Sequence, residues 1–271
     1  MKIYKVGGAV RDSLMGVKSY DTDWVVVGSS PEEMVSNGFK PIGKDFPVFL
    51  HPETHEEYAL ARTEKKTGTG YGGFTFYYGK DVTLEEDLSR RDFTINAIAQ
   101  DHTGVIIDPF DGQNDIKNKL FRHVSDAFFE DPLRAIRLAR FFSYDHLKDF
   151  DIDASTIECI KKIVSSREIA DISSDRIWSE TERALSNSNP SKYFEKIISL
   201  NLLDPYFSKL TKSSCDSHNN KTLRWAELQI NNDFELGSEL PLPNDFKNIV
   251  EVCKIALKLN KDTNLDDLIL F

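Results

Sequence analysis

The chain has 271 residues, of which 40% are hydrophobic and 18 are Phe, enough to bury a substantial core in one or two domains. The formal net charge of −10 counts against nucleic acid as a partner, because phosphate binding usually needs a basic surface, although a local basic cleft is compatible with an acidic total. No apolar run reaches the roughly 20 residues of a membrane span, and the first residues lack the apolar stretch of a signal peptide, so we expect no membrane partner.

The cysteine content predicts a reducing compartment. Cys159, Cys215 and Cys253 are odd in number, lie far apart and form no C-x-x-C pair. A disulfide framework or a zinc site is therefore not expected, and a cytoplasmic location fits best.

The first part of the chain has the pattern of an α/β domain. Short apolar runs bounded by glycine or polar turns predict strands, and one or two helical turns are expected from Ala9 to Met15. Ser30, Pro31 and Glu33 have the types expected at the N-cap, N1 and N3 positions of a helix that ends near Gly38. The predicted strands cover residues 2–6, 23–27, 46–50, 56–62 and 105–107.

After about Lys117 the strand-like runs disappear and helical periodicity takes over. The polar segment 211–221 is interpreted as a loop or linker. The sequence thus predicts an α+β protein with a small α/β head followed by an all-helical part. Helices are expected at residues 132–142, 155–166, 174–187, 190–200 and 244–259.

A pair of carboxylates precedes the apolar strand at 23–27. Side chains two residues apart on a strand face the same side, so Asp21 and Asp23 are expected to lie close together. Two close carboxylates repel each other unless a cation lies between them, and Mg²⁺ prefers oxygen ligands of this kind together with substrate phosphates. The alternative is a solvated D-x-D loop before a strand, a common pattern.

A glycine loop a few residues upstream favours the functional interpretation. Gly7 and Gly8 enter a short helix, and backbone N–H groups in such a loop approach phosphates closely. Arg11 would add a fixed cation for phosphate oxygens. The combination G-G-x-V-R-D followed by D-x-D is far more specific than either motif alone.

Five motifs in a fixed order resemble the class II tRNA nucleotidyltransferases, the CCA-adding enzymes, and the related bacterial poly(A) polymerases. The resemblance covers roughly residues 1–210, and the segment 45–66 is similar to the bacterial CCA-adding branch in particular. It implies a polymerase-β-like head with a small mixed sheet, followed by a helical neck and body. The motifs are GGAVRD at 7–12, DTD at 21–23, RRDFTINA at 90–97, DPFDG at 108–112 and EDPLRAIRLARF at 130–141.

The resemblance also implies roles at the reacting phosphate. Asp21 and Asp23 would hold the catalytic Mg²⁺ ions, and Glu57 would be a third carboxylate. Gly8 and Arg11 would hold the triphosphate. One metal would activate the tRNA 3′-hydroxyl and the other would stabilise the leaving pyrophosphate.

A second set of roles concerns the nucleotide. The resemblance implies that Arg91 contacts it and that Asp131 and Arg134 read the Watson–Crick edge of the base, while Arg137 and Arg140 complete the nucleotide-binding face. The residues support this independently. Asp131 is followed by Pro132, which suits an N-cap and N1, and no acidic residue three or four positions away offsets Arg137 or Arg140. The alternative is a solvated basic face with Asp131 as a cap only.

The expected domains are a nucleotidyltransferase head at 1–117, a helical neck at 118–210 and a short helical body at 211–271. Many enzymes of this branch continue into a His-Asp phosphohydrolase domain. Ile230 and Asn231 stand where that doublet would fall, so no phosphohydrolase activity is expected. The short C-terminal part is compatible with a truncated chain, a naturally reduced enzyme, or reliance on a partner or on dimerisation, and the oligomeric state is not indicated.

The leading hypothesis is an enzyme that adds CCA to the 3′ end of tRNA from CTP and ATP with Mg²⁺. Within the class, the alternatives are a poly(A) polymerase or an enzyme that adds only CC or A. A nucleotidyltransferase acting on a small molecule would not require the E-D-x-x-R helix. A non-catalytic RNA-binding protein is the alternative from another class, against which the intact Asp21, Asp23 and Arg91 argue.

Overall fold

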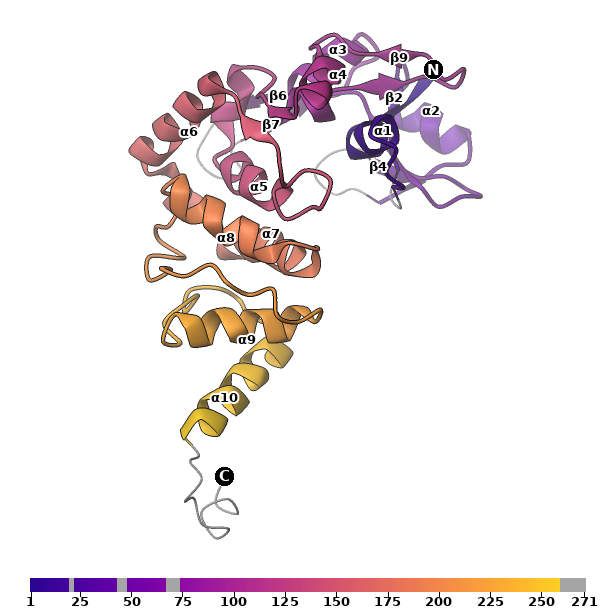
Figure 1. Cartoon of the computed structure of the whole chain (residues 1–271). Helices are drawn as coiled ribbons and strands as arrows, with labels where there is room; N and C mark the ends of the chain where they lie inside the picture. The colour runs from indigo at the N-terminus through magenta and orange to yellow at the C-terminus, as the bar shows by residue number, and fades with distance from the viewer. Residues whose placement is uncertain (20–21, 43–47, 67–73, 259–271) are drawn as a thin grey trace. The chain divides into compact units, whose positions relative to one another are not determined.

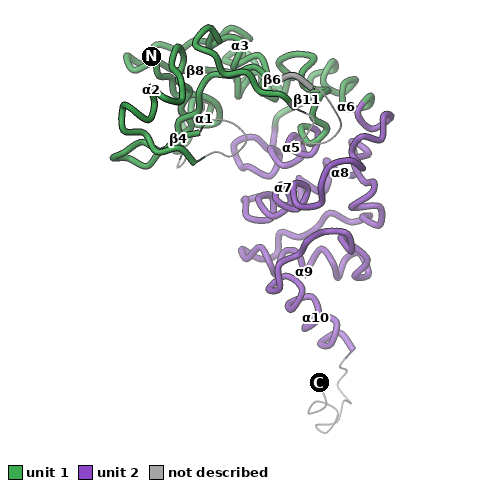
Figure 2. Tube along the Cα trace, turned by 180° about the vertical axis from the view of Figure 1, so that it is seen from behind, with its two compact units in different colours: residues 1–134, 150–162 green, residues 135–149, 163–271 purple. Residues whose placement is uncertain are grey.

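The computed structural model describes residues 1–19, 22–42, 48–66 and 74–258 (Figure 1). The chain divides into two compact units (Figure 2). Unit 1 comprises residues 1–134 and 150–162, and unit 2 comprises residues 135–149 and 163–271. The finer division into head, neck and body remains a prediction.

Unit 1 is built on a mixed sheet of seven strands in which β2 and β5 run parallel and every other neighbouring pair runs antiparallel. The α+β fold class is confirmed. The strands, in spatial order, are β3 (Lys40–Pro41), β4 (Val48–Leu50), β5 (Glu57–Leu60), β2 (Asp23–Val27), β1 (Lys2–Val6), β8 (Ala99–Gln100) and β9 (Ile106–Ile107).

Short helices and two small sheets complete unit 1. The helices are α1 (Gly8–Leu14), α2 (Pro31–Ser36), α3 (Leu84–Ser89) and α4 (Gly112–Lys117), with 3₁₀ turns η2 (Thr94–Asn96) and η3 (Asp126–Glu130). The small sheets pair β6 (Thr63–Lys66) with β7 (Phe74–Tyr77) and β10 (Leu120–Phe121) with β11 (Asp151–Ile152).

Two apolar clusters cover opposite faces of the large sheet. Val25 packs in one cluster with Leu88 of α3, and the next residue, Val26, packs in the other with Met34 of α2. Successive strand residues point to opposite faces, so β2 separates the two clusters. The strand predicted at 23–27 is confirmed, and its residues Val25 and Val26 are buried.

Capping boxes begin α2 and α3. Ser30 Oγ accepts from the Glu33 N–H at 3.4 Å, and the Glu33 carboxylate accepts from the Ser30 N–H at 3.3 Å, as predicted from their types. Thr83 and Glu86 make the same reciprocal pair at the start of α3. That second box carries an equally clear T-x-x-E signature, although α3 is absent from the predicted elements.

The expectation that strands end near Lys117 was wrong. Strands β10 and β11 pair in parallel, but each has two residues, too few to show a period of two. The β6–β7 hairpin and α9 (Lys221–Asn231) were also missed. Helix α9 begins with a cap formed by a neighbouring residue, because Asn220 Oδ1 accepts from the N–H groups of Thr222 and Leu223.

Unit 2 is helical, and the predicted helices agree with those observed to within two residues at each end. Trp178 of α7 meets Trp225 of α9 and Phe246 of α10 edge to face, at ring-centroid distances of 5.5 and 4.9 Å. None of the helices among the described residues is long and apolar enough to cross a membrane. The helices are α5 (Leu133–Phe141) and α6 (Ala154–Ser166), which begin in unit 1, then α7 (Ser174–Ser186), α8 (Pro190–Ser199), α9 and α10 (Asn244–Lys258).

Candidate active site

Two carboxylates occupy neighbouring positions on one face of the large sheet. The parallel register of β2 and β5 pairs Trp24 with Tyr58, and their rings stack at 5.5 Å. One residue earlier on each strand, Asp23 and Glu57 therefore face the opposite side, on strands about 4.8 Å apart. Both are exposed, and neither makes a hydrogen bond or ion pair with another described residue. Such a pair is suited to bind a hard cation.

Asp21 lies outside the described residues, so the expected pairing of Asp21 with Asp23 stays a prediction. Within the described ranges, no group of three metal-ligating side chains comes together. The described donors for a cation at the beginning of β2 and β5 are the carboxylates of Asp23 and Glu57.

Gly7 connects β1 to α1 at a point where side chains crowd its backbone. Its φ of 73° lies in the left-handed region that favours glycine. A Cβ atom at this position would lie 3.0 Å from Arg91 Nη1 and 3.8 Å from Asp23 Oδ2. The Arg91 guanidinium and the Asp23 carboxylate thus border the same stretch of backbone, where the positive φ favours glycine.

Gly8 begins α1, and Arg11 lies one turn later. The Arg11 side chain is only 4% exposed. Its Nε and Nη2 donate to Asp12 Oδ1 at 2.8 and 2.7 Å, and its Nη1 donates to Asn96 Oδ1 at 2.7 Å. The sequence predicted Arg11 as a cation for phosphate; the structure adds that this guanidinium is anchored inside unit 1.

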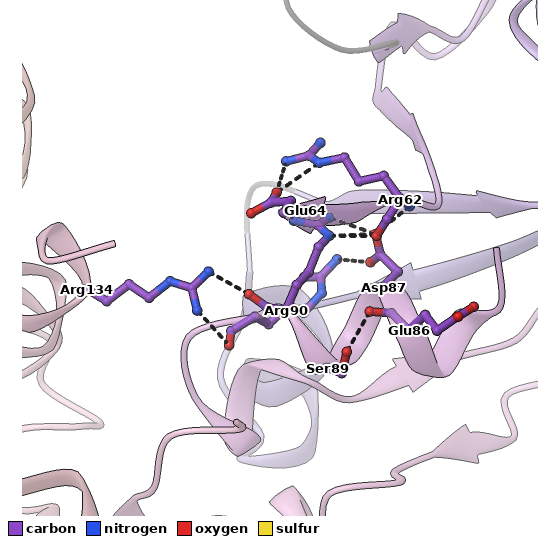
Figure 3. Close-up of polar contacts among 8 residues, drawn as sticks. Arg62, Glu64, Glu86, Asp87, Ser89, Arg90 and Arg134 are labelled. Atoms are coloured by element: carbon purple, nitrogen blue, oxygen red, sulfur yellow. Dashed lines mark hydrogen bonds and ion pairs between the residues drawn. The ribbon is translucent and has the colours of Figure 1, made fainter. Parts of the chain in front are cut away.

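A cluster of ion pairs positions the segment that follows α3 (Figure 3). Asp87 is fully buried, and its two oxygens accept from Arg90 Nη2 at 2.7 Å and Arg91 Nη2 at 3.3 Å. Glu64 Oε1 accepts from both Arg90 and Arg62, at 2.8 and 2.9 Å. Strand β6 and helix α3 are thereby held together beside Arg91.

The charge of Asp87 makes this cluster sensitive to acid. Burial raises the pKa of the Asp87 carboxyl, but the charges of Arg90 and Arg91 outweigh burial and the pKa lies below the ordinary value of 3.8. A depressed pKa in the folded state means that the carboxylate stabilises the fold above its unfolded pKa and that this contribution is lost as the pH falls through the folded pKa.

We expect Asp87→Asn to lower the free energy of unfolding by about 3 kcal/mol near neutral pH, because two arginines lose their buried partner. The difference from wild type should be constant between about pH 7 and pH 5 and shrink below about pH 4, as protonation removes the same charge from the wild type. Urea unfolding at a series of pH values measures it. A difference that stays flat or grows on acidification would contradict the assignment.

Asp131 and Arg134 lie at the start of α5. Asp131 Oδ1 accepts from the Leu133 N–H at 3.2 Å, so the predicted cap is confirmed. Arg134 is 8% exposed, and its Nη2 and Nη1 donate to the carbonyls of Arg90 and Arg91 at 2.7 and 3.4 Å (Figure 3). Arg134 therefore fixes the backbone of the segment that carries Arg91.

Arg137 and Arg140 have a carboxylate partner in unit 2 that their spacing in the sequence did not reveal. Arg140 Nε donates to buried Glu180 of α7, and its Nη1 donates to the Tyr144 hydroxyl at 2.8 Å. Arg137 Nη1 lies 3.7 Å from the other Glu180 oxygen. Glu180 offsets their charge, so the argument from an unbalanced row of arginines does not hold for these two. Their place at the nucleotide stays a prediction.

Sequence reasoning missed the residues that position the site. Asp87 had a local signal, because it precedes Arg91 by four residues in an acid-before-base helical pattern. Asn96 stands inside the quoted RRDFTINA motif, but nothing in the sequence indicates that it meets Arg11, 85 residues away.

Comparisons with known proteins identify the family of the chain. A profile of the Poly A polymerase head domain matches residues 3–122, and one described as a probable RNA and SrmB-binding site of polymerase A matches residues 149–213. The structure of the CCA-adding enzyme of Bacillus stearothermophilus in complex with CTP superposes with a TM-score of 0.77 at 27% identity, over 94% of this chain and 66% of that chain. A tRNA nucleotidyltransferase complexed with a primer tRNA and an incoming ATP analog shares the fold, with a TM-score of 0.71 at 23% identity over 96% of this chain and 84% of the other.

The fold and the matching head-domain profile identify an α+β nucleotidyltransferase with a polymerase-β-like head. A CCA-adding enzyme of Coxiella burnetii (strain RSA 331) is 48% identical over 262 residues, which make up 92% of this chain and 69% of the relative. The chain belongs to the family of CCA-adding enzymes, and the family resemblance is confirmed. It spans about two thirds of the length of the Coxiella and Bacillus relatives.

Proposed function

We propose that the protein adds C, C and A to the 3′ end of tRNA, using CTP and ATP. The observation that carries the proposal is the convergence at Gly7, where the Asp23 carboxylate and the Arg91 guanidinium approach one backbone position. A triphosphate that binds a cation held by Asp23 would also contact the Arg91 guanidinium and the backbone at Gly7. A cation, a guanidinium and backbone N–H groups together are suited to bind phosphate oxygens. The 48% identity to a CCA-adding enzyme supports tRNA as the acceptor.

A divalent metal ion is general in nucleotidyltransferases of this kind, and we propose Mg²⁺ held by Asp21 and Asp23, with Glu57 as a further carboxylate. The donor set fits a hard cation, because Asp23 and Glu57 offer exposed carboxylate oxygens without partners among the described residues. The bound ion would supply charge stabilisation for the transferred phosphoryl group and favour ionisation of the attacking hydroxyl.

The tasks of the chain's own residues follow from their positions. Gly8 and Arg11 would receive the triphosphate, with Arg11 held in one orientation by Asp12 and Asn96. Arg91 would contact the nucleotide beside Gly7. A triphosphate bound between Arg11 and Arg91 would keep its orientation during the reaction, because both guanidinium groups are held in place before it binds.

Base selection is proposed for Asp131 and Arg134, with Arg137 and Arg140 completing the surface. A carboxylate accepts from an exocyclic amine and a guanidinium donates to ring acceptors. Cytosine and adenine both carry that amine, whereas uracil lacks it and guanine presents a carbonyl. The hydrogen bonds of Arg134 to two carbonyls hold the plane of its guanidinium at the start of α5.

We expect Arg134→Ala to reduce the preference for CTP over UTP by roughly 10- to 100-fold, the value of one bidentate base contact. The dependence on Mg²⁺ concentration should not change, because neither Asp23 nor Glu57 makes a hydrogen bond or ion pair with Arg134. Arg134→Lys keeps the charge but loses the planar fork, and should lose most of the preference as well. Steady-state kcat/KM for CTP and UTP over a Mg²⁺ titration measures both. A CTP/UTP ratio that is unchanged in both variants would remove Arg134 from base reading.

Three tRNA substrates test the proposed function. They end before CCA, after the first C and after the second C, and each is incubated with Mg²⁺ and every triphosphate singly, then with CTP and ATP together. Ordered addition of C, C and A supports the proposal. Long A tails would indicate a poly(A) polymerase, partial addition a CC- or A-adding enzyme, and no addition the non-catalytic RNA-binding alternative.

The remaining proposals concern organisation. We keep the head at 1–117, the neck at 118–210 and the short body at 211–271 as functional parts, and a cytoplasmic location, where uncompleted tRNA would be met. With a net charge of −10, tRNA binding requires a locally basic surface, and its affinity should fall steeply with salt.

A further inference from the structure

Asn96 is a buried amide between two segments of the candidate site. It closes the 3₁₀ turn η2 and is 6% exposed. Its Oδ1 accepts from Arg11 Nη1 at 2.7 Å, and its Nδ2 donates to Asp92 Oδ1 at 2.9 Å. Both partners are charged and buried as well, at 4% and 7% exposure. Hydrogen bonds to charged groups are stronger than those between neutral groups, particularly in the protein interior.

The two contacts fix the orientation of the amide. A guanidinium only donates and a carboxylate only accepts, so Oδ1 must face Arg11 and Nδ2 must face Asp92. A flipped amide would set donor against donor and acceptor against acceptor. No other uncharged side chain of this size offers one donor and one acceptor in this arrangement.

The contacts continue on both sides of Asn96. Arg11 binds the carboxylate of Asp12, so carboxylate, guanidinium, amide and carboxylate follow one another through the interior of unit 1. Asp12 and Arg11 belong to α1, which follows the glycine loop. Asp92, at the other end of the series, directly follows Arg91 in the chain. The main chain is tied at the same place, because the Gly7 N–H donates to the Ile98 carbonyl at 3.2 Å.

We infer that Asn96 is a positioning residue for the nucleotide: it holds Arg11 and the Arg91–Asp92 segment in one mutual arrangement, so that the triphosphate meets both together. The inference rests on the proposed function and adds a residue to it. Arg91 lies beside Gly7 and Arg11 beside Gly8, and Asn96 binds both Arg11 and Asp92, the residue that follows Arg91. Without it, binding would have to order two segments that are now ordered in advance.

Asn96→Ala is expected to raise KM for CTP and for ATP together by roughly tenfold, the value of a lost hydrogen bond to a charged group. The turnover number should change by less than about threefold, because Asp23 is untouched. The CTP/UTP preference should not change, in contrast to Arg134→Ala. A purely structural role would instead reduce the fraction of active protein, which lowers the turnover number and leaves KM as it is.

Gln229→Ala is the matched control. Gln229 is 3% exposed and makes two amide hydrogen bonds, to the carbonyl and the N–H of Leu236 in unit 2. The Gln229→Ala substitution removes two buried hydrogen bonds, as Asn96→Ala does, but at a position that does not contact Arg11. At temperatures equally far below the unfolding midpoint of each variant, Gln229→Ala should keep the wild-type KM for both triphosphates. An equal rise of KM in the control would overturn the inference.

A double-mutant cycle tests the contact itself. Asn96→Asp places a carboxylate against the carboxylate of Asp92, whereas Asp92→Asn removes the charge but keeps one oxygen that can accept from Asn96; together they exchange the two groups and again set one amide donor against one carboxylate acceptor. We expect the pair to bind CTP at least about fivefold more tightly than the sum of the two single effects predicts. Additive effects would overturn the inference.

CTP affinity is measured by calorimetry on the full chain without tRNA. The cycle therefore reports on Asn96 even if no nucleotide is added to tRNA, in which case the proposed function alone fails. If CCA is added normally while the cycle is additive and KM of Asn96→Ala is unchanged, the role of Asn96 fails and the proposed function stands.

Discussion

Asp23→Asn should lower the rate of nucleotide addition to tRNA by roughly a thousandfold or more, since several kcal/mol of transition-state stabilisation depend on the cation that this carboxylate would hold. The asparagine keeps the size of the side chain and the start of β2, and Asp23 is exposed without a partner among the described residues. The thermal midpoint should consequently remain that of wild type. Single-turnover addition of C to a tRNA that lacks CCA measures the rate.

Asp151→Asn provides the control for this loss. Asp151 is also exposed and also lies on a strand of unit 1, but in the two-stranded sheet β10–β11. Its substitution removes the same charge from the protein without touching the face that carries Asp23 and Glu57. A near-normal rate for Asp23→Asn, or an equal loss for Asp151→Asn, would show that the cation site has been placed wrongly.

Glu180→Ala is expected to produce the largest loss of stability, about 3–5 kcal/mol, because it leaves the Arg140 guanidinium buried without its carboxylate. Glu180 and Arg140 are each 4% exposed, so water cannot replace the lost partner. Chemical denaturation followed by tryptophan fluorescence is suitable, since Trp178 lies on the same helix.

A neighbouring glutamate calibrates that result. Glu182, two residues further along α7, pairs with Lys221 at 2.5 Å where both side chains are partly exposed. Glu182→Ala should cost less than about 1 kcal/mol. The pair Glu180→Leu with Arg140→Met removes both charges and should recover most of the stability. If Glu180→Ala costs no more than Glu182→Ala, the buried ion pair contributes little to the fold.

Local sequence patterns predicted the elements that local physics determines. The strand at 23–27, the cap at Ser30 and the cap at Asp131 each depend on residues within a few positions of one another, and all are confirmed. The family resemblance was specific for the same reason: its five motifs are short and ordered. The α+β class followed from the change in periodicity near Lys117, although two short strands lie beyond it.

Pairings across the chain could not be predicted in this way. Glu57 becomes the neighbour of Asp23 only because β5 runs parallel to β2 in one register, and no local pattern specifies that register. Glu180 reaches Arg140 from another helix, 40 residues away. These contacts determine which charged side chains already have a partner within the protein. A charged side chain with such a partner can position its neighbours, whereas one without a partner is available to bind a ligand.

CCA addition is measured by sequencing the 3′ ends of a tRNA that lacks CCA after incubation with the protein, Mg²⁺ and all four nucleoside triphosphates. We expect products that end in CCA with no nucleotide beyond the A, and no such products with the Asp23→Asn variant. Heterogeneous ends that include U or G, a run of A residues, or unextended tRNA would contradict it.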